Sequence, residues 1–222
     1  MSDMKIIAVL PARNEASRIG NVLTGIKRTR AITKIIVVDD ASTDDTAAVA
    51  KAAGASIIRL KRHGGVGTAT RAGLTVALRL KPEAIIFMDA DGQHDPRYIP
   101  AFLREIDAGA QFVLGRRHLS NYPRTKRFGN FVLRLLARLL CPTGLADPEC
   151  GYRAISLKAA LALDLRAKGY DICMDFIYNA WKNKLRTAQV WIRVPTYYSQ
   201  KGTKIRTGLA NFWWLLKRRL LG

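Results

Sequence analysis

The chain is poor in the residues that build zinc sites and disulfide scaffolds, and it lacks the long apolar run of a membrane span. Its 222 residues include only three cysteines, Cys141, Cys150 and Cys173, and three histidines. No two cysteines form a C-x-x-C pair, which argues against a zinc or disulfide framework and favours a reducing compartment. No apolar run reaches the roughly 18 residues needed to cross a bilayer, and the N-terminal segment is unlike a signal peptide. We therefore expect a protein that is soluble or lies on a membrane.

Acidic residues are scarce over two long stretches. The chain has 37 Lys and Arg against 17 Asp and Glu, a formal net charge of +20. Residues 108–146 contain no acid, and neither do residues 176–222. A positive charge of this size predicts an anionic partner, which is nucleic acid, an acidic membrane surface or a phosphorylated substrate. Net charge alone does not choose among the three.

Apolar residues are plentiful, at 49% of the chain, and their pattern predicts an α/β fold. Short β-rich runs alternate with amphipathic stretches, which is typical of βαβ units around a mostly parallel sheet. The expected strands are residues 5–10, 34–38, 56–60, 84–88 and 112–114. The expected helices are residues 16–28, a stretch that starts at the Ser-Thr-Asp-Asp of 42–45 and closes at Gly54, and residues 68–80. We expect one domain with a basic C-terminal extension.

Polar residues follow two of the expected strands directly. Asp39 and Asp40 follow the strand at 34–38, and Asp89, Asp91 and Gln93 follow the strand at 84–88. Ligands of open parallel sheets bind beyond the carboxyl ends of the strands. If the segment is extended, residues i, i+2 and i+4 point the same way and offer three oxygen ligands to Mg²⁺ or Mn²⁺. A nucleoside diphosphate is the natural companion of such a metal.

Other interpretations of these motifs meet the spacing less well. In a calcium loop that begins at Asp89, the sixth position is His94 rather than glycine and the twelfth is Pro100 rather than glutamate. The segment GGVGTATRAG lacks the third glycine of a dinucleotide fingerprint, and no G-x-x-x-x-G-K-[ST] motif is present. An isolated D-x-D with a following glycine also occurs in ordinary solvated turns, and this alternative stays open on spacing alone.

A set of motifs resembles the glycosyltransferase family 2 enzymes, which have a GT-A fold. They are PARNE at 11–15, VVDDASTDDT at 37–46, GVGTATRAG at 65–73, MDADGQHDP at 88–96, LGRR at 114–117, ECGYRAIS at 149–156 and KGTKIR at 201–206. The subgroup that the chain most resembles is the dolichol-phosphate mannose synthases and related polyprenyl-phosphate glycosyltransferases. The resemblance covers about the first 205 residues and is specific as a set.

The resemblance implies roles for individual residues. Asp89, Asp91 and Gln93 would hold Mg²⁺ or Mn²⁺, and the catalytic residues would be Asp91, Arg117 and Asp175. The residues implied in binding the nucleotide sugar are Pro11, Arg13, Glu15, Val38, Asp40, Asp89, Ala90, Asp91, Gln93, Arg117, Lys201 and Lys204.

The chain also departs from the family pattern. Asp175 stands where the family has glutamate and is one methylene shorter, and Lys201 and Thr203 stand in place of arginine and serine. Lysine is a point charge and loses the bidentate geometry of arginine. Cys150 replaces the serine of the S-G-F-R element, and we expect it to be a packing residue rather than a nucleophile.

The basic residues bear on the acceptor. A phosphate monoester, with its second pKa near ~6, is already largely dianionic and needs cations more than a general base. The candidates that would bind an acceptor phosphate are Arg117, Arg124, Lys126 and Arg127. A hydroxyl acceptor would instead need a base, and Asp175 is the candidate for that role.

Two amphipathic segments predict contact with a membrane. Residues 126–140 place apolar side chains on one face and arginines largely on another, and residues 211–221 set paired tryptophans beside three cations. The alternative is that both pack inward or form a dimer interface. We expect a catalytic domain at residues 1–205 and a membrane-interfacial helix at 206–222.

Together these observations predict a metal-dependent, inverting glycosyltransferase. It would move a hexose, mannose or glucose, from a GDP- or UDP-sugar to a polyprenyl or dolichyl phosphate. We expect it at the cytoplasmic face of the membrane, on anionic lipid, with or without a separate membrane subunit. A nucleic-acid-binding module is the alternative from another class, but no reader motif supports it and no nucleic acid partner is expected. The chain also lacks the N-terminal glycine-rich phosphate loop that a nucleotidyltransferase would have.

Overall fold

The computed structural model describes residues 4–118, 134–135, 137–194 and 205–221, with the backbone alone for 205–209. The strands are β1 (Ile6–Ala12), β2 (Lys34–Asp39), β3 (Ser56–Arg59), β4 (Ala84–Phe87), β5 (Phe112–Arg117), β6 (Arg153–Ser156) and β7 (Thr187–Ile192). The helices are α1 (Ala16–Arg28), α2 (Thr46–Ala52), α3 (Val66–Arg79), the short 3₁₀ helix η1 (Pro96–Tyr98), α4 (Ile99–Asp107), α6 (Leu157–Leu161), α7 (Ile172–Lys182) and α8 (Ile205–Leu221). Residues 134, 135 and 137–140 are also helical.

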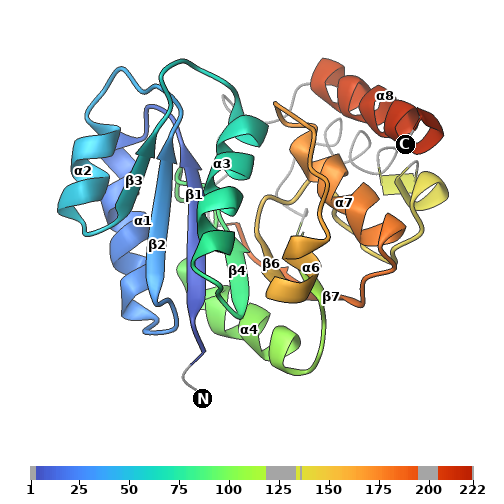
Figure 1. Cartoon of the computed structure of the whole chain (residues 1–222), viewed down its shortest axis with the longest axis horizontal. Helices are drawn as coiled ribbons and strands as arrows, with labels where there is room; N and C mark the ends of the chain where they lie inside the picture. Colours follow the sequence, from blue (N-terminus) through green and yellow to red (C-terminus); the bar gives the residue numbers. More distant parts are fainter. Residues whose placement is uncertain (1–3, 119–133, 136, 195–204, 222) are drawn as a thin grey trace.

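The strands form one seven-stranded sheet in the order β3-β2-β1-β4-β6-β5-β7 (Figure 1). Strands β3, β2, β1 and β4 run parallel, and β7 runs parallel to β5. Strand β6 runs antiparallel to both of its neighbours, β4 and β5. The expected α/β fold with a mostly parallel sheet is confirmed.

Helices α3 and α7 pack on the same face of this sheet. Val9 of β1 and Phe87 of β4 are register partners, so their side chains point to the same face. Helix α3 lies over Val9 so closely that a Cβ on Gly73 would come within 2.4 Å of it. Phe87 meets Phe176 of α7 edge to face, with ring centroids 5.3 Å apart. Helices α3 and α7 therefore cover one face, which is the face towards the viewer around β1 and β4 in Figure 1.

The expected elements of the first half agree closely with the structure. The helix at 16–28 has the predicted bounds, and the five expected strands all form, with ends that differ by up to three residues. The acids at 44–45 do not enter the first turn of α2, which begins at Thr46. Asp44 instead accepts hydrogen bonds from the backbone N–H groups of Ala16 and Thr46, because this loop also has to meet the start of α1.

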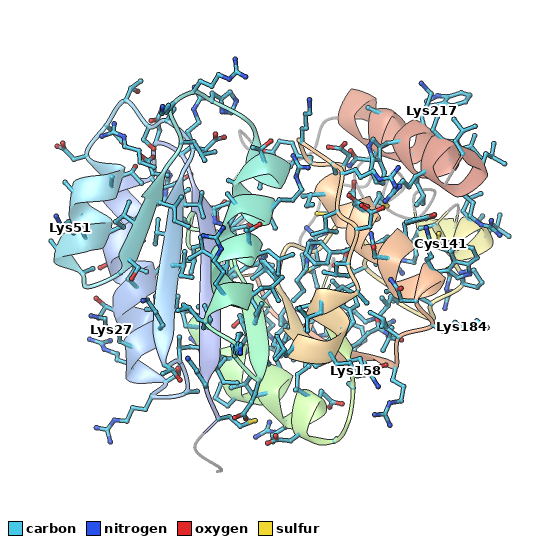
Figure 2. The ribbon with its side chains drawn as sticks, viewed as in Figure 1. Lys27, Lys51, Cys141, Lys158, Lys184 and Lys217 are labelled. Carbon is cyan, nitrogen blue, oxygen red and sulfur yellow. The ribbon has the colours of Figure 1, made fainter. Side chains whose placement is uncertain are left out.

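The C-terminal helix packs on the domain. Asn211, Leu215 and Arg218 of α8 are buried on one side of the helix, whereas Trp213 is 58% exposed on another. Lys217 points outward from α8 (Figure 2). One of the three cations expected beside the tryptophans, Arg218, is therefore turned inward. The rest of the amphipathic segment at 126–140, from residue 126 to 133 and at 136, lies outside the described residues.

Candidate active site

The polar residues predicted from the sequence gather at the carboxyl ends of three neighbouring parallel strands. Strands β2, β1 and β4 are adjacent in the sheet, so the loops that follow them meet at one edge. These loops contain PARNE, the D-D-A-S-T segment and the D-x-D. This is the edge at which open α/β sheets bind their ligands.

Hydrogen bonds through side chains join the loop after β1 to the loop after β2. The backbone N–H of Asn14 donates to Oγ of Ser42 at 3.0 Å, and Oδ1 of Asn14 accepts from the backbone N–H of Thr43 at 2.9 Å. The N–H of Glu15 donates to Oγ1 of Thr46 at 2.8 Å. Asn14 has a φ of 54°, which asparagine tolerates better than most residues. These hydrogen bonds hold the two motifs together on one side of the site.

Asp40 holds a glycine turn in place. Its Oδ1 accepts from the N–H of Gly64 at 2.7 Å, and its Oδ2 accepts from the N–H of Gly65 at 2.9 Å. The same Oδ2 lies 2.7 Å from Nδ1 of His63. Asp40 is only 3% exposed. Its contacts in the structure are those of an anchor for the loop before α3, and a direct contact with the nucleotide stays a prediction.

The first acid of the D-x-D is fixed by its surroundings. The N–H of Asp89 donates to Nδ1 of His94 at 3.0 Å, and His94 stacks on Tyr152 with centroids 5.1 Å apart. Burial lowers the pKa of His94, so the ring is neutral and can accept this hydrogen bond. A Cβ on Gly151 would lie 2.9 Å from Oδ2 of Asp89. The side chain of Asp89 is 43% exposed, and its Oδ2 lies 3.6 Å from Nδ1 of His94.

The segment after β4 turns and is not extended as expected. Residues 90–92 form a turn, with a φ of 84° at Gly92, and the N–H of Gln93 donates to Oδ1 of Asp91 at 3.0 Å. The premise of an extended segment is therefore wrong, and the alternation of side chains along a strand no longer supports three oxygens on one side. Coordination by Gln93 itself stays a prediction.

The charges of the two carboxylates at this turn also act on a tyrosine. The pKa of Tyr170 is raised, chiefly by burial and then by the charges of Asp89 and Asp91. Within the described ranges, no three His, Cys, Asp or Glu side chains are grouped to enclose a metal. A magnesium site needs only one or two carboxylates when the substrate supplies phosphate oxygens. The exposed Asp89 carboxylate and the neighbouring Asp91 fit that requirement.

Arg117 lies at the end of β5 and is tied to Asp147. Its Nε and one terminal nitrogen donate to the two carboxylate oxygens at 2.7 and 2.8 Å, and its backbone N–H donates as well, at 3.1 Å. Both side chains are largely buried, at 16% and 6% exposed. Arg117 is therefore a bidentate partner of Asp147, and its contact with a phosphate stays a prediction.

Asp175 is a buried anchor and has no carboxylate oxygen open to an acceptor. It is 0% exposed. Its Oδ2 accepts from the N–H groups of Arg166 and Ala167 at 2.5 and 2.9 Å, and its Oδ1 accepts from Nδ2 of Asn179 at 3.1 Å. Burial raises the pKa of Asp175, although these hydrogen bonds oppose the shift. The expectation of a catalytic base at this position does not agree with these contacts.

The other predicted residues differ in where they lie. Arg13 is exposed, and Pro11 is half-buried. Val38 and Ala90 are buried in the core below the site, at 0% and 2% exposed. The residues that fall outside the described ranges are Lys201, Lys204, Arg124, Lys126 and Arg127.

Sequence reasoning missed several residues that shape the site. His94 and Gly151 lie inside recognised motifs, but only the fold shows that both touch Asp89. Asp147 and Tyr170 are far from their partners along the chain and carry no local signal. Cys150 is fully buried, and burial raises its pKa to about 12, as expected of a packing residue.

Comparisons with known proteins agree with this fold. The chain is 32% identical over 247 residues to the UDP-N-acetylglucosamine–dolichyl-phosphate N-acetylglucosaminyltransferase of Methanococcus voltae, covering 99% of this chain and 98% of that one. It is 27% identical over 200 residues to the polyprenol monophosphomannose synthase of Mycolicibacterium smegmatis, covering 84% and 76%.

A solved structure has the same architecture. The glucosyl-3-phosphoglycerate synthase of Mycobacterium tuberculosis, in complex with Mn²⁺, UDP and glucosyl-3-phosphoglycerate, superposes with a TM-score of 0.76 at 24% identity, covering 98% of this chain and 80% of that one. This similarity supports the GT-A fold. The profile of the family described as "Glycosyl transferase family 2" matches residues 7–160. The chain therefore belongs to glycosyl transferase family 2 and is a glycosyltransferase.

Proposed function

We propose that this protein transfers a hexose, mannose or glucose, from a GDP- or UDP-sugar to a polyprenyl or dolichyl phosphate in a reaction that needs Mg²⁺ or Mn²⁺. The observation that carries the proposal is the pair Asp89 and Asp91. The pair follows β4, at the same edge of the sheet as the hydrogen-bonded loops after β1 and β2. Relatives whose names specify dolichyl or polyprenyl phosphate chemistry support the choice of acceptor.

The residues of the chain divide the work of donor binding. Asp89 and Asp91 would hold the divalent cation, with the diphosphate oxygens of the donor completing its shell. When bound, such a cation takes up the negative charge that develops on the departing nucleoside diphosphate. Asp40 fixes the turn at Gly64 and Gly65. Pro11, Arg13 and Glu15 would complete the nucleotide site, as the family resemblance implies.

An acceptor phosphate fits the described site better than a hydroxyl acceptor. A hydroxyl group must lose its proton as it attacks, whereas a dianionic phosphate oxygen can attack the anomeric carbon directly. Asp175, the expected base, is buried and occupied by backbone N–H groups. In a single displacement the new bond forms as the bond to the diphosphate breaks, and the anomeric configuration inverts.

A membrane surface would keep the acceptor's tail in lipid. In the part of the chain that the structure describes, no helix is both long and apolar enough to span a bilayer. The side chains of Leu139, Leu220 and Leu221 are 71%, 73% and 84% exposed. Nε of Arg219 donates to the carbonyl of Leu140 at 3.2 Å, so α8 lies beside helical residues 137–140 (Figure 1). We define these three leucines with Trp213 as the apolar rim, which would rest at the cytoplasmic face of an anionic membrane.

UDP-N-acetylglucosamine is a second candidate donor. It is favoured by the relative from Methanococcus voltae, whose name specifies that donor and which matches this chain at 32% identity over nearly its full length. The choice between the donors depends on loop contacts with the base and with the sugar 2-position.

The first experiment measures transfer from labelled GDP-mannose, GDP- and UDP-glucose and UDP-N-acetylglucosamine. Each donor is tested with Mn²⁺, with Mg²⁺ or with a chelator, and with or without a short-chain polyprenyl phosphate. We expect label in the organic phase only when metal and phosphate acceptor are both present. Transfer that persists in chelator would contradict the metal assignment, and transfer to the free prenol but not its phosphate would contradict the acceptor.

A second experiment tests the membrane surface. The full chain is floated with vesicles of phosphatidylcholine alone or with added phosphatidylglycerol, beside a Leu139→Glu, Leu220→Glu variant. We expect salt-sensitive binding to the anionic vesicles and its loss in the variant, because two carboxylates at the apolar rim oppose insertion. Equal binding of variant and wild type would overturn the assignment of this surface.

A further inference from the structure

Helix α8 is attached to the rest of the molecule by a buried arginine. The Arg218 side chain is 5% exposed. One terminal nitrogen donates to the carbonyl of Asp164 at 2.7 Å and to its carboxylate at 2.9 Å. Nε of Arg218 lies 3.8 Å from Oδ1 of Asp175, and the guanidinium lies over the ring of Tyr178 at 4.9 Å. Burying a guanidinium is costly, so its partners matter to the folded state.

Two residues of α7, Asp175 and Asn179, hold one short segment, residues 164–168. Asp175 accepts from the N–H groups of Arg166 and Ala167. Asn179 accepts from the N–H of Asp164 at 2.8 Å and donates to Asp175. Two residues of α7, Asp175 and Asn179, and one residue of α8, Arg218, therefore contact the segment.

This segment in turn supports the start of α3. The carbonyl of Lys168 accepts from the N–H of Thr68 at 3.1 Å. Added Cβ atoms at Gly65 and Gly67 would come within 2.6 and 2.7 Å of the carbonyl oxygens of Lys168 and Ala167, so the two backbones are in direct contact. Gly65 is also a donor to Asp40. A displacement of the segment would therefore reach the turn that Asp40 holds.

The segment also leads into the start of α7. Tyr170 follows it by two residues, and the pKa of Tyr170 is raised by burial and then by the charges of Asp89 and Asp91. The N–H of Gly169 donates to Asp171 at 2.8 Å, and the N–H of Cys173 donates to the carbonyl of Tyr170 at 3.2 Å, which join Tyr170 to the start of α7.

We propose that Arg218 is a positioning residue of the donor site. By pairing with Asp164 and Asp175 it fixes residues 164–168, and through them the glycine turn before α3. Docking of α8 is thus part of the assembly of the nucleotide site, although α8 contributes no described contact to that site. This inference rests on the proposed function, since it assigns the carboxylate edge to a nucleotide.

The test compares Arg218→Met with Arg166→Met in the full chain. Methionine keeps an unbranched, flexible side chain about as far as the position of Nε, but it removes the guanidinium, its charge and its hydrogen bonds. Arg166 is the matched control because it pairs with the same Asp164 carboxylate at 2.8 Å, but from the surface, with its side chain 58% exposed. Asp164→Asn breaks the pair from its half-exposed side and serves if Arg218→Met does not fold.

Two readouts separate positioning from mere stability. Hydrogen exchange reports the amides of Thr68, Arg166 and Ala167, and calorimetry at a temperature well below unfolding measures the dissociation constants of UDP and GDP with Mn²⁺. For Arg218→Met we expect faster exchange at these three amides and about tenfold weaker nucleotide binding, a size typical of coupling between sites. Arg166→Met should leave both near wild type.

The outcomes are distinct. Faster exchange confined to α8, with unchanged amides at 68, 166 and 167 and unchanged nucleotide affinity, would overturn the positioning role. Equal weakening by Arg166→Met would also overturn it, because any loss of charge near Asp164 would then suffice. If the wild-type chain binds neither nucleotide, the proposed function fails, while the exchange data still decide whether Arg218 fixes the segment.

Discussion

Replacing Gly151 by alanine adds one methyl group directly against the acidic turn. Its Cβ would lie 2.9 and 3.0 Å from the two carboxylate oxygens of Asp89 and 3.0 Å from Cε1 of His94. His94 cannot yield, because it is buried, stacked on Tyr152 and bonded to the backbone of Asp89. The half-exposed carboxylate has to move instead. Relief to an ordinary contact near ~3.5 Å needs a shift of about half an ångström.

That shift is small for the fold and large for a metal ligand. Overpacking costs about 1–3 kcal/mol. The lower end of this range is expected here, because Asp89 can rotate towards solvent although the contact with His94 stays tight. Misplacing a reacting group by about 1 Å can cost about 100-fold in rate. We therefore expect Gly151→Ala to unfold close to the wild-type temperature but to lose roughly tenfold to 100-fold in metal-dependent nucleotide affinity, measured by calorimetry with Mn²⁺.

The matched control is Gly20→Ala in α1, whose nearest neighbour beyond its own helix would be Val49 at 3.4 Å. It should keep nucleotide affinity and gain about 0.5–1 kcal/mol of stability from its helical position. Wild-type affinity in Gly151→Ala would refute the reasoning, since the Asp89 carboxylate could then not be a ligand held by this cradle.

Three further predictions concern single carboxylates. Asp91→Asn should fold normally and weaken Mn²⁺-dependent nucleotide binding by at least about 100-fold, as expected when a ligand rather than its outer support is lost; a change of less than about threefold would exclude Asp91 from the metal site. Asp175→Asn should cost about 1–3 kcal/mol in urea unfolding, because the amide must turn its NH₂ towards the donors of either Ala167 or Asn179; lost turnover at unchanged stability would instead restore the role of base. Hydrogen bonds from Arg166 and then Arg218 lower the pKa of Asp164 from 3.8 to about 2. The contribution of this carboxylate to the free energy of unfolding is therefore fully present above pH 3.8 and is lost as the pH falls towards 2. Since this side chain is 51% exposed, we expect the free energies of unfolding of wild type and Asp164→Asn to differ by no more than about 1 kcal/mol at about pH 5. The difference should shrink towards about pH 3, and a difference that grew on acidification would contradict the direction of the pKa shift.

Local patterns were sufficient for the first half of the fold. The helix at 16–28 and the strands that became β1, β2 and β4 are marked by periodicity and by apolar runs that the sheet buries on both faces. Strands β6 and β7 and helices α4, α6 and α7 were not predicted. Strand β6 is four residues long and antiparallel to its neighbours, so no βαβ pattern announces it.

The sequence by itself determined which residue types stand after the strands, and with them the family and the candidate ligands Asp89 and Asp91. Only the tertiary structure decided which charged residues pair with each other. From the sequence, Asp175 resembles a site residue and Arg218 a lipid-facing charge, yet the two meet in the interior, with Nε and Oδ1 3.8 Å apart. The physical reason is that a charge pattern is local, whereas the partner that makes a buried charge tolerable is 43 residues away and is chosen by packing.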